Sequence, residues 1–106
     1  MFARTVSIHL KANSAAEFTR TIENEILPLL RKQKGFQDEI TLVAPDGKQA
    51  LAVSFWDLKE SADAYEREAY QQILKSMARV VEGTPKVETY NVSNSTSHKI
   101  ASRIAA

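Results

Sequence analysis

The fold is decided by residues 36–56, which read FQDEITLVAPDGKQALAVSFW. Two runs rich in β-branched and aromatic residues flank a Pro-Asp-Gly sequence at 45–47. Proline and glycine at these positions favour a short hairpin turn, so the stretch predicts two antiparallel strands, at 36–44 and 48–56. Strand residues alternate between two faces, so one side of the second strand carries Leu51, Val53 and Phe55, and the other carries Ala50, Ala52, Ser54 and Trp56.

The segment before this hairpin predicts one strand and one helix. Residues 2–11 alternate, with Phe2, Val6, Ile8 and Leu10 opposite Thr5, Ser7, His9 and Lys11, which is typical of a strand with unlike faces. Ser14 and Glu17 have the spacing of a capping box at the start of an amphipathic helix. Pro28 is expected to kink this helix, and Gly35 to follow its end.

The segment after the hairpin predicts a second helix and a fourth strand. Asp57 and Glu60 resemble a helix start, and apolar positions at helical spacing extend the helix over about 58–82. Whether the helix breaks near residues 68–70 is left open. Gly83 and Pro85 are expected to end the helix, and residues 85–93 to form the last strand.

The order of elements predicts an α+β, ferredoxin-like βαββαβ domain: a four-stranded antiparallel sheet with two helices on one face. We place Ala50, Ala52 and Trp56 on the other, bare face, and a half-apolar bare face favours a homodimer through it. Residues 1–93 form the domain and 94–106 a C-terminal tail. Ile100 and Ile104 have helical spacing, so the tail is either partly ordered or a short helical arm on a partner subunit.

Composition narrows the classes of partner and cofactor. The formal charge of +1 gives no basic surface for nucleic acid or for an anionic membrane. Cysteine is absent, which excludes disulfides and thiolate metal sites, and the two histidines have no metal-ligand spacing. With no segment resembling a signal peptide or a membrane span, we expect a cytoplasmic protein without metal or cofactor.

The chain resembles the antibiotic biosynthesis monooxygenase superfamily of dimeric α/β-barrel proteins over residues 2–93. Four stretches carry the resemblance: Leu27-Pro28 to Gly35-Phe36, the hairpin turn at 45–47, Phe55-Trp56-Asp57 with Tyr65 and Tyr70, and Gly83-Thr84-Pro85. The resemblance implies oxidation of phenolic polycycles by molecular oxygen, without metal or flavin, in a pocket near a tryptophan that Trp56 matches. Ala52 and Ser54 occupy the stretch where such members carry an asparagine.

Another branch of the superfamily degrades haem through a histidine on the second helix. Lys75 stands at about that position here, and the two histidines are His9 and His98. The sequence therefore implies no haem ligand.

Six residues are candidates for a site: Trp56, Tyr65 and Arg79 for catalysis, and Tyr70, His9 and Phe55 for contact with the substrate. Each also has a structural interpretation. Trp56 either stacks on an aromatic substrate or seals the sheet, and Tyr65 either donates to a developing oxyanion or packs in the core. Arg79 either binds an anion or pairs with a glutamate such as Glu82, and His9 is either a base or an interface residue.

A domain of this kind has three candidate functional classes. The first is a cofactor-independent monooxygenase-like protein acting on a small aromatic or quinol-type molecule. The alternative is a non-catalytic dimer that binds or senses a small ligand. Recognition of nucleic acid through the bare face is disfavoured, because its expected members Thr5, Ser7 and His9 are not the aromatic residues on which bases stack.

Overall fold

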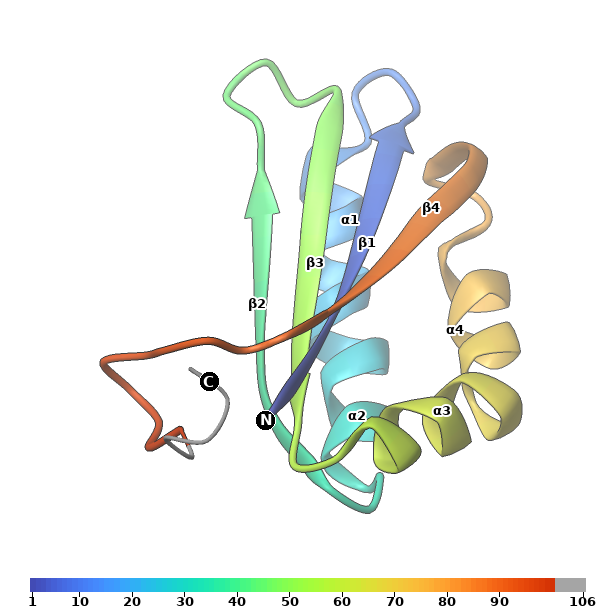
Figure 1. Ribbon diagram of the computed structural model, residues 1–106. Coiled ribbons are helices and arrows are strands. Elements are labelled where there is room, and N and C mark those ends of the chain that lie inside the picture. Colours follow the sequence, from blue (N-terminus) through green and yellow to red (C-terminus); the bar gives the residue numbers. More distant parts are fainter. Residues whose placement is uncertain (101–106) are drawn as a thin grey trace.

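A computed structural model describes residues 1–100 of the chain. Its strands are β1 (Phe2–Leu10), β2 (Phe36–Val43), β3 (Gln49–Trp56) and β4 (Val81–Asn91), in one antiparallel sheet of order β2-β3-β1-β4. The first helical segment comprises α1 (Ala15–Thr21), η1 (Ile22–Ile26) and α2 (Leu27–Arg31), and the second comprises α3 (Lys59–Glu68) and α4 (Tyr70–Met77). Both segments cover the same face of the sheet (Figure 1). The predicted α+β ferredoxin-like fold is confirmed.

The core lies between the helices and the inner face of the sheet. Alternate residues of β1 are buried there, and helical residues such as Phe18, Ile73 and Met77 pack against them. Phe18, Trp56 and Val80 are the largest fully buried side chains. None of the helices within residues 1–100 is long and apolar enough to cross a membrane.

The predicted face of β3 was wrong. Phe2 pairs with Trp56 and Val6 pairs with Ala52, so these four residues share the inner face. The alternation predicted within each strand is confirmed, but alternation alone does not show which face of one strand lies beside which face of its neighbour. The outer face therefore carries Leu51, Val53 and Phe55, together with Ile40 and Leu42 of β2.

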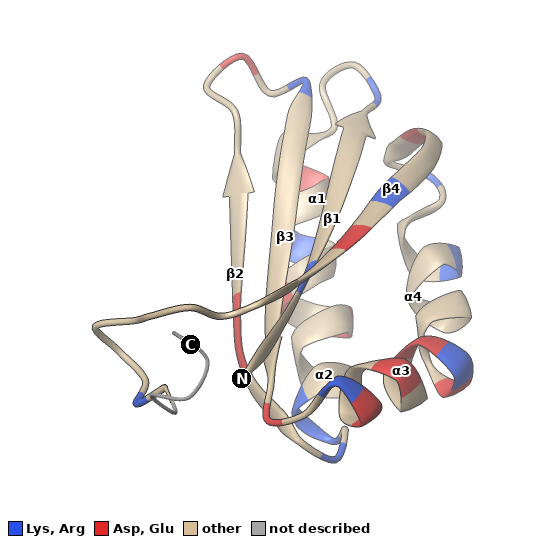
Figure 2. Ribbon diagram, viewed as in Figure 1, with Lys and Arg blue, Asp and Glu red and all other residues tan. Residues whose placement is uncertain are grey.

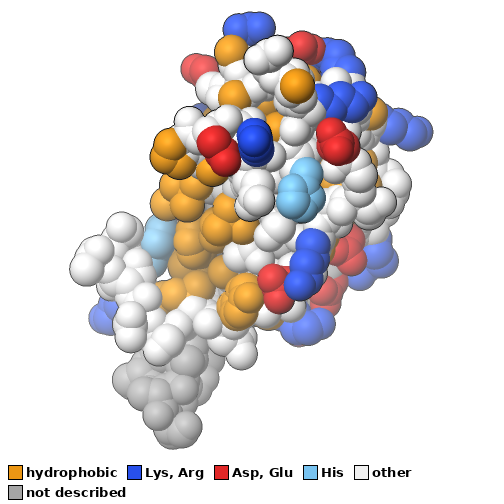
Figure 3. Space-filling view, turned by 90° about the horizontal axis from the view of Figure 1, so that it is seen from above, with side chains coloured by type: hydrophobic (Ala, Val, Ile, Leu, Met, Phe, Trp, Pro, Cys, Tyr) orange, Lys and Arg blue, Asp and Glu red, His pale blue; other side chains and the backbone are white. Residues whose placement is uncertain are grey.

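The outer face is consequently more apolar than the sequence predicted. Ile40 is 49% exposed and Leu42 is 53% exposed. Apolar side chains form a continuous patch along one side of the molecule (Figure 3), and the middle of β3 carries no charge (Figure 2).

The second helix and the last strand also differ from the prediction. The helical segment ends at Met77, and β4 begins at Val81, which pairs with Leu10 of β1. Gly83 has a φ of +74° and lies in an irregularity of the β1–β4 register. The residues predicted to end the helix therefore form a bulge inside the strand. A helix break does occur, at Ala69, between α3 and α4.

The predicted capping box of the first helix is absent. The Ser14 hydroxyl donates to the Ala12 carbonyl oxygen at 3.3 Å, and no side chain caps α1. Glu17 instead forms an ion pair with Arg79. Pro28 lies in the first turn of α2, directly after the π-helical turn η1, where a missing backbone donor is tolerated.

The predicted helical arm is not seen in the described part of the tail, because residues 94–100 contain no helix. The rest of that prediction, residues 101–106, lies outside the described residues. The Val92 amide donates to the Met1 carbonyl oxygen at 2.9 Å, which fixes the start of the tail beside β1.

Gly35 allows a first test of the fold. Its φ is +82°, and a methyl group placed on it would overlap Asp57 and Ser61, coming within 2.6 Å of the Ser61 Cβ. We expect Gly35→Ala to lower the free energy of unfolding by about 3 kcal/mol, from left-handed strain plus overpacking. Gly83→Ala is the matched control: its φ is +74° with nothing within 4 Å, so only the strain of about 1–2 kcal/mol should appear. Urea unfolding of both variants measures the difference, and equal losses would contradict the packing at Gly35.

Candidate functional site

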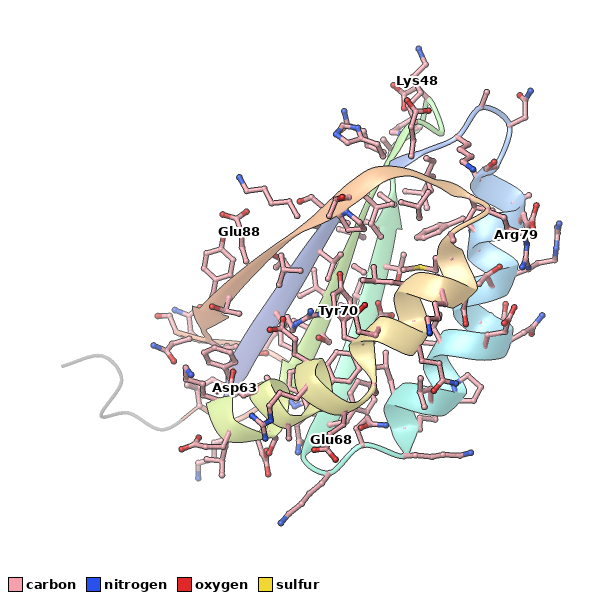
Figure 4. The ribbon with its side chains drawn as sticks, turned by 90° about the vertical axis from the view of Figure 1, so that its right-hand side faces the viewer. Lys48, Asp63, Glu68, Tyr70, Arg79 and Glu88 are labelled. Atoms are coloured by element: carbon pink, nitrogen blue, oxygen red, sulfur yellow. The ribbon has the colours of Figure 1, made fainter. Side chains whose placement is uncertain are left out.

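A cavity of about 30 Å³ lies between the sheet and the helices. Its polar wall consists of Arg4, Glu39, Ser54, Tyr65 and Tyr70, contributed by β1, β2, β3, α3 and α4. The other wall residues are apolar and include Val6, Ile22, Ile26, Ile73 and Met77. Figure 4 shows Tyr70 in this position, between the helices and the sheet. A volume of this size holds one water molecule or one small group of a ligand.

Arg4 is the charged centre of the cavity. It lies on the inner face of β1 and is only 2% exposed. One guanidinium nitrogen, Nη2, donates to the Glu66 carboxylate at 3.0 Å. Its Nε is buried and is one of two such side-chain polar atoms within residues 1–100 that have no hydrogen-bond partner. A buried donor without a partner is costly, and in a native structure it calls for an explanation.

The two tyrosines enclose the Arg4 guanidinium. Its carbon Cζ lies 4.0 Å from the ring centroid of Tyr70 and 5.3 Å from that of Tyr65. These are cation–π distances. Burial raises the pKa of both phenols, and the nearby Arg4 charge opposes this in each case. Both tyrosines therefore keep their protons at neutral pH and can donate them in hydrogen bonds.

The helix break at Ala69 positions these tyrosines. Tyr65 lies near the end of α3 and Tyr70 begins α4, and their ring centroids are 6.2 Å apart. In one continuous helix, residues five apart point in clearly different directions. The break lets both rings face Arg4.

Trp56 supports the wall of the cavity through Ser54 and Tyr65. The indole Nε1 donates to the Ser54 hydroxyl oxygen at 2.9 Å, and the indole ring lies 4.9 Å from the Tyr65 ring. Trp56 is fully buried. Its contacts thus fix the orientation of two wall residues.

Glu39 enters the cavity from the edge strand β2. Phe36 pairs with Trp56 and Asp38 pairs with Phe55, so Gln37 is an extra residue in β2. The extra residue changes which face of the sheet the residues after it point to. This bulge turns Glu39 inward, opposite Ser54. The Thr41 hydroxyl donates to a Glu39 carboxylate oxygen at 2.6 Å. Burial raises the pKa of Glu39, the Thr41 hydrogen bond opposes that rise, and the Asp38 charge adds to it.

A surface groove of about 390 Å³ lies outside the cavity, between β2 and the first helical segment. It is lined by Thr19, Ile22, Glu23, Leu27, Arg31, Glu39, Thr41 and Val43. Glu39 and Ile22 line both the groove and the cavity, so they form the partition between them. The groove has the volume of a small-molecule site, whereas the cavity alone does not.

The structure brings three of the six predicted site residues together. Trp56, Tyr65 and Tyr70 form one cluster on the inner side of the sheet. Arg79 lies elsewhere, because it is exposed and pairs with Glu17 and, at 3.8 Å, with Glu25. Those ion pairs join the residues that follow α4 to the first helical segment, and Figure 4 shows Arg79 beside that segment.

His9 and Phe55 lie on the outer face of the sheet, away from the cavity. His9 is exposed and lines a hollow of about 410 Å³ whose other residues include Ser7, Leu42 and Leu51. The Phe55 ring is 6.4 Å from the His98 ring of the tail, and His98 Nε2 is 3.6 Å from an Asp38 carboxylate oxygen. Both residues lie on the other side of the sheet from Arg4, and Phe55 lies beside the tail.

Sequence reasoning missed Arg4, Glu39 and Ser54. Arg4 had a readable signal, because it interrupts the apolar set of β1 between Phe2 and Val6. A charge within a buried strand face is rare unless it is paired or functional. Glu39 had no such signal, since the bulge at Gln37 cannot be read from the alternation of β2.

The cluster combines an acid, a buried cation and two neutral phenols. Within residues 1–100, no group of three or more histidine, aspartate or glutamate side chains is arranged to hold a metal ion. Glu39 can take up or release a proton, and Arg4 with the tyrosines can stabilise an anionic oxygen. The arrangement is therefore able to bind a weak acid and hold its conjugate base.

Comparison with solved structures places this geometry in a known fold. A putative antibiotic biosynthesis monooxygenase from Bordetella bronchiseptica matches with a TM-score of 0.74 at 14% identity, over 88% of this chain and 97% of the other. SnoaB, a cofactor-independent oxygenase from Streptomyces nogalater, matches with a TM-score of 0.75 at 10% identity, over 92% and 97%. A monooxygenase from the gene ActVA-Orf6 of Streptomyces coelicolor, solved with nanaomycin D, matches with a TM-score of 0.71 at 15% identity, over 89% and 88%.

No family model matches the sequence, and no curated protein matches it. The chain has the fold of the antibiotic biosynthesis monooxygenases, so the resemblance drawn from the sequence is confirmed at the level of the fold. At identities of 10–15% the structural match itself assigns no reaction.

The raised pKa of Glu39 gives a stability prediction. A carboxyl whose pKa is higher in the folded state than in the unfolded state contributes stability below its unfolded pKa and loses it as pH rises through its folded pKa. Glu39→Gln removes the carboxylate, so it should raise the melting temperature at pH 8 and give a smaller gain at pH 4. Glu68→Gln, at an exposed position on α3, is the control and should change little at either pH. Thermal unfolding at the two pH values measures this, and a Glu39→Gln gain that is larger at pH 4 would contradict it.

Proposed function

We propose that this protein is a cofactor-independent monooxygenase-like enzyme acting on a small aromatic or quinol-type molecule between β2 and the helices. The observation that carries the proposal is the buried Arg4 guanidinium, which belongs to a residue lining the cavity and whose Nε has no hydrogen-bond partner. Replacing a buried ion pair by apolar side chains of similar volume is often neutral or stabilising, so packing alone does not account for an arginine at this position. A ligand oxygen at this position would supply the missing acceptor.

The groove and the cavity suit different parts of one ligand. The groove has room for a flat aromatic body and offers the apolar side chains Ile22, Leu27 and Val43 to its faces. The cavity has room for one oxygen substituent, which would face Arg4 and the two tyrosines. Binding in this way requires Ile22 or Glu39 to shift, since these residues separate the two spaces.

The proposed reaction needs molecular oxygen and the substrate alone. An electron-rich phenolic ring system, as its anion, gives electrons to oxygen. In the net reaction a ring methylene becomes a carbonyl: one oxygen atom is incorporated and the other leaves as water, which takes the two methylene hydrogens. Arg4 would stabilise the anionic oxygen of the substrate, and Tyr65 and Tyr70 would donate hydrogen bonds to it. SnoaB, which shares this fold, is a cofactor-independent oxygenase.

Ligand binding and oxygen uptake test this proposal with 1,8-dihydroxyanthrone as the probe. A ligand present at about a hundred times its dissociation constant should add roughly 2.7 kcal/mol of stability, and oxygen should be consumed in equal amount to the anthrone. Arg4→Met keeps the side-chain length but removes the charge, and it should abolish both effects. Arg79→Met is the matched control, because Arg79 lies outside the cluster, and it should retain both.

Two outcomes separate the alternatives. Binding without oxygen uptake would favour the non-catalytic, ligand-sensing dimer. An Arg4→Met variant that melts cooperatively and still binds and oxidises the probe would overturn the role given to Arg4.

We also propose that two copies of the chain associate through the outer face of the sheet. This face presents Ile40, Leu42, Leu51, Val53 and Phe55, and exposed apolar patches of this kind mark interaction sites. The face lies on the opposite side of the sheet from both helical segments (Figure 1), so a partner would not block the groove.

The substitutions Ile40→Lys and Leu42→Lys, made together, test this association. They place two charges in the apolar patch, so the double variant should sediment as a monomer while the wild type sediments as a dimer. Leu58→Lys, at a position 59% exposed beside α3, is the control and should leave the dimer intact. Analytical ultracentrifugation distinguishes the species, and a monomeric wild type would end this part of the proposal.

A further inference from the structure

We propose that Glu39 is the proton acceptor of this site, and that the substrates are aromatic compounds that bind as neutral acids and are ionised in place. The inference rests on the proposed function and deepens it, since it specifies the substrate class and assigns a catalytic residue.

The position of Glu39 supports this role. Its side chain lines both the groove, where the body of a ligand would lie, and the cavity that holds the Arg4 guanidinium. The β-bulge at Gln37 directs it inward from an edge strand. One carboxylate oxygen, Oε2, accepts from Thr41 at 2.6 Å, and this hydrogen bond orients the carboxyl group. Bulges beside functional sites commonly re-aim a side chain in this way.

Charged and titratable groups from five other elements share a space with Glu39. Arg4 of β1, Tyr65 of α3 and Tyr70 of α4 line the cavity with it, while Glu23 of η1 and Arg31 of α2 line the groove. Asp38 is its neighbour on β2. Burial and the Asp38 charge raise the pKa of Glu39, which brings the carboxyl closer to the acidity of a weak acid that it must deprotonate.

The proton comes from a ring methylene that is conjugated with a carbonyl through the aromatic rings. A C–H bond of the methylene breaks, its proton goes to the Glu39 carboxylate, and its electron pair moves through the ring to the carbonyl oxygen. The substrate becomes an enolate, and its anionic oxygen accepts from Arg4. A phenolic O–H would react in the same way, with the charge formed directly on oxygen. No electron leaves the substrate in this step.

This arrangement selects against ligands that are already anionic. Glu23 and Glu39 line the groove, and Asp38 and Glu39 line a second hollow of about 350 Å³ between β2 and α2. Arg31 is the only arginine or lysine on the walls of these two spaces within the described residues. A preformed anion would meet these carboxylates before it reached Arg4. A neutral acid avoids this repulsion and develops its charge only beside the buried cation.

The test measures ionisation of 1,8-dihydroxyanthrone without oxygen, so that deprotonation is observed apart from oxidation. The anion of the probe absorbs at longer wavelength than the neutral form, and stopped-flow absorbance follows its appearance on the wild-type protein. We expect Glu39→Gln to retain the thermal shift by the probe but to ionise it at least a hundredfold more slowly, within the usual range for loss of a general base. Glu39→Asp should recover part of the rate, and Glu68→Gln should match the wild type.

The pH profile provides a second measurement. The wild-type ionisation rate should rise with pH as Glu39 loses its proton, and this rise should disappear in Glu39→Gln. A Glu39→Gln variant that ionises the probe at the wild-type rate would overturn the role of Glu39 and leave the proposed function standing. Wild-type protein that neither binds the anthrone nor takes up oxygen would overturn both.

Discussion

The interaction on which the rest of the site depends is the enclosure of the Arg4 guanidinium between the sheet and the helices. A charge that is 2% exposed must be compensated, and here Glu66 and the rings of Tyr65 and Tyr70 compensate it. The Glu66 carboxylate is half exposed, so it pairs with the side of the guanidinium that is nearer the solvent. Burying a charged group costs several kcal/mol even after relaxation, and an apolar residue at this position would serve a small core better. The inner face is therefore organised around holding a cation rather than around maximal stability.

Two irregular segments face each other across the groove, and each creates part of it. On the strand side, the bulge at Gln37 turns Glu39 inward. On the helix side, the π-helical turn η1 and Pro28 interrupt the regular helix where Ile22 and Leu27 line the groove. Such bulges in strands and helices are concentrated at functional sites, because they aim side chains that a regular element would point elsewhere. The site lies where the local geometry is least ideal, and the stability of the domain comes from the regular parts of β1, β3 and the helices.

The sequence predicted the order of the elements well but not the relation between neighbouring strands. Alternation identified both faces of β1 and of β3, yet the pairing of Phe2 with Trp56 can be known only from the register. Because the register was unknown, Trp56 was predicted on the bare face, whereas it lies in the core, and Phe55 lies on the outer face instead. A similar limit applied to Gly83, because a glycine signals a turn or a strand bulge equally well. The burial of Arg4 could be predicted, because Arg4 lies between Phe2 and Val6 in the apolar set of β1, whatever the register.

The two faces of the sheet are coupled through the strands that they share. Glu39 and Ile40 are neighbours on β2, with Glu39 facing the cavity and Ile40 facing outward. As an edge strand, β2 is held on one side only by β3, so its position depends on hydrogen bonds to a single neighbour. A partner packed on Ile40 and Val53 would restrain both strands at the level of Glu39 and Ser54, which pair with each other. Precise placement of a catalytic group requires that its supporting residues be fixed. Association through the outer face would thus contribute to the chemistry of the inner face without donating any residue to it.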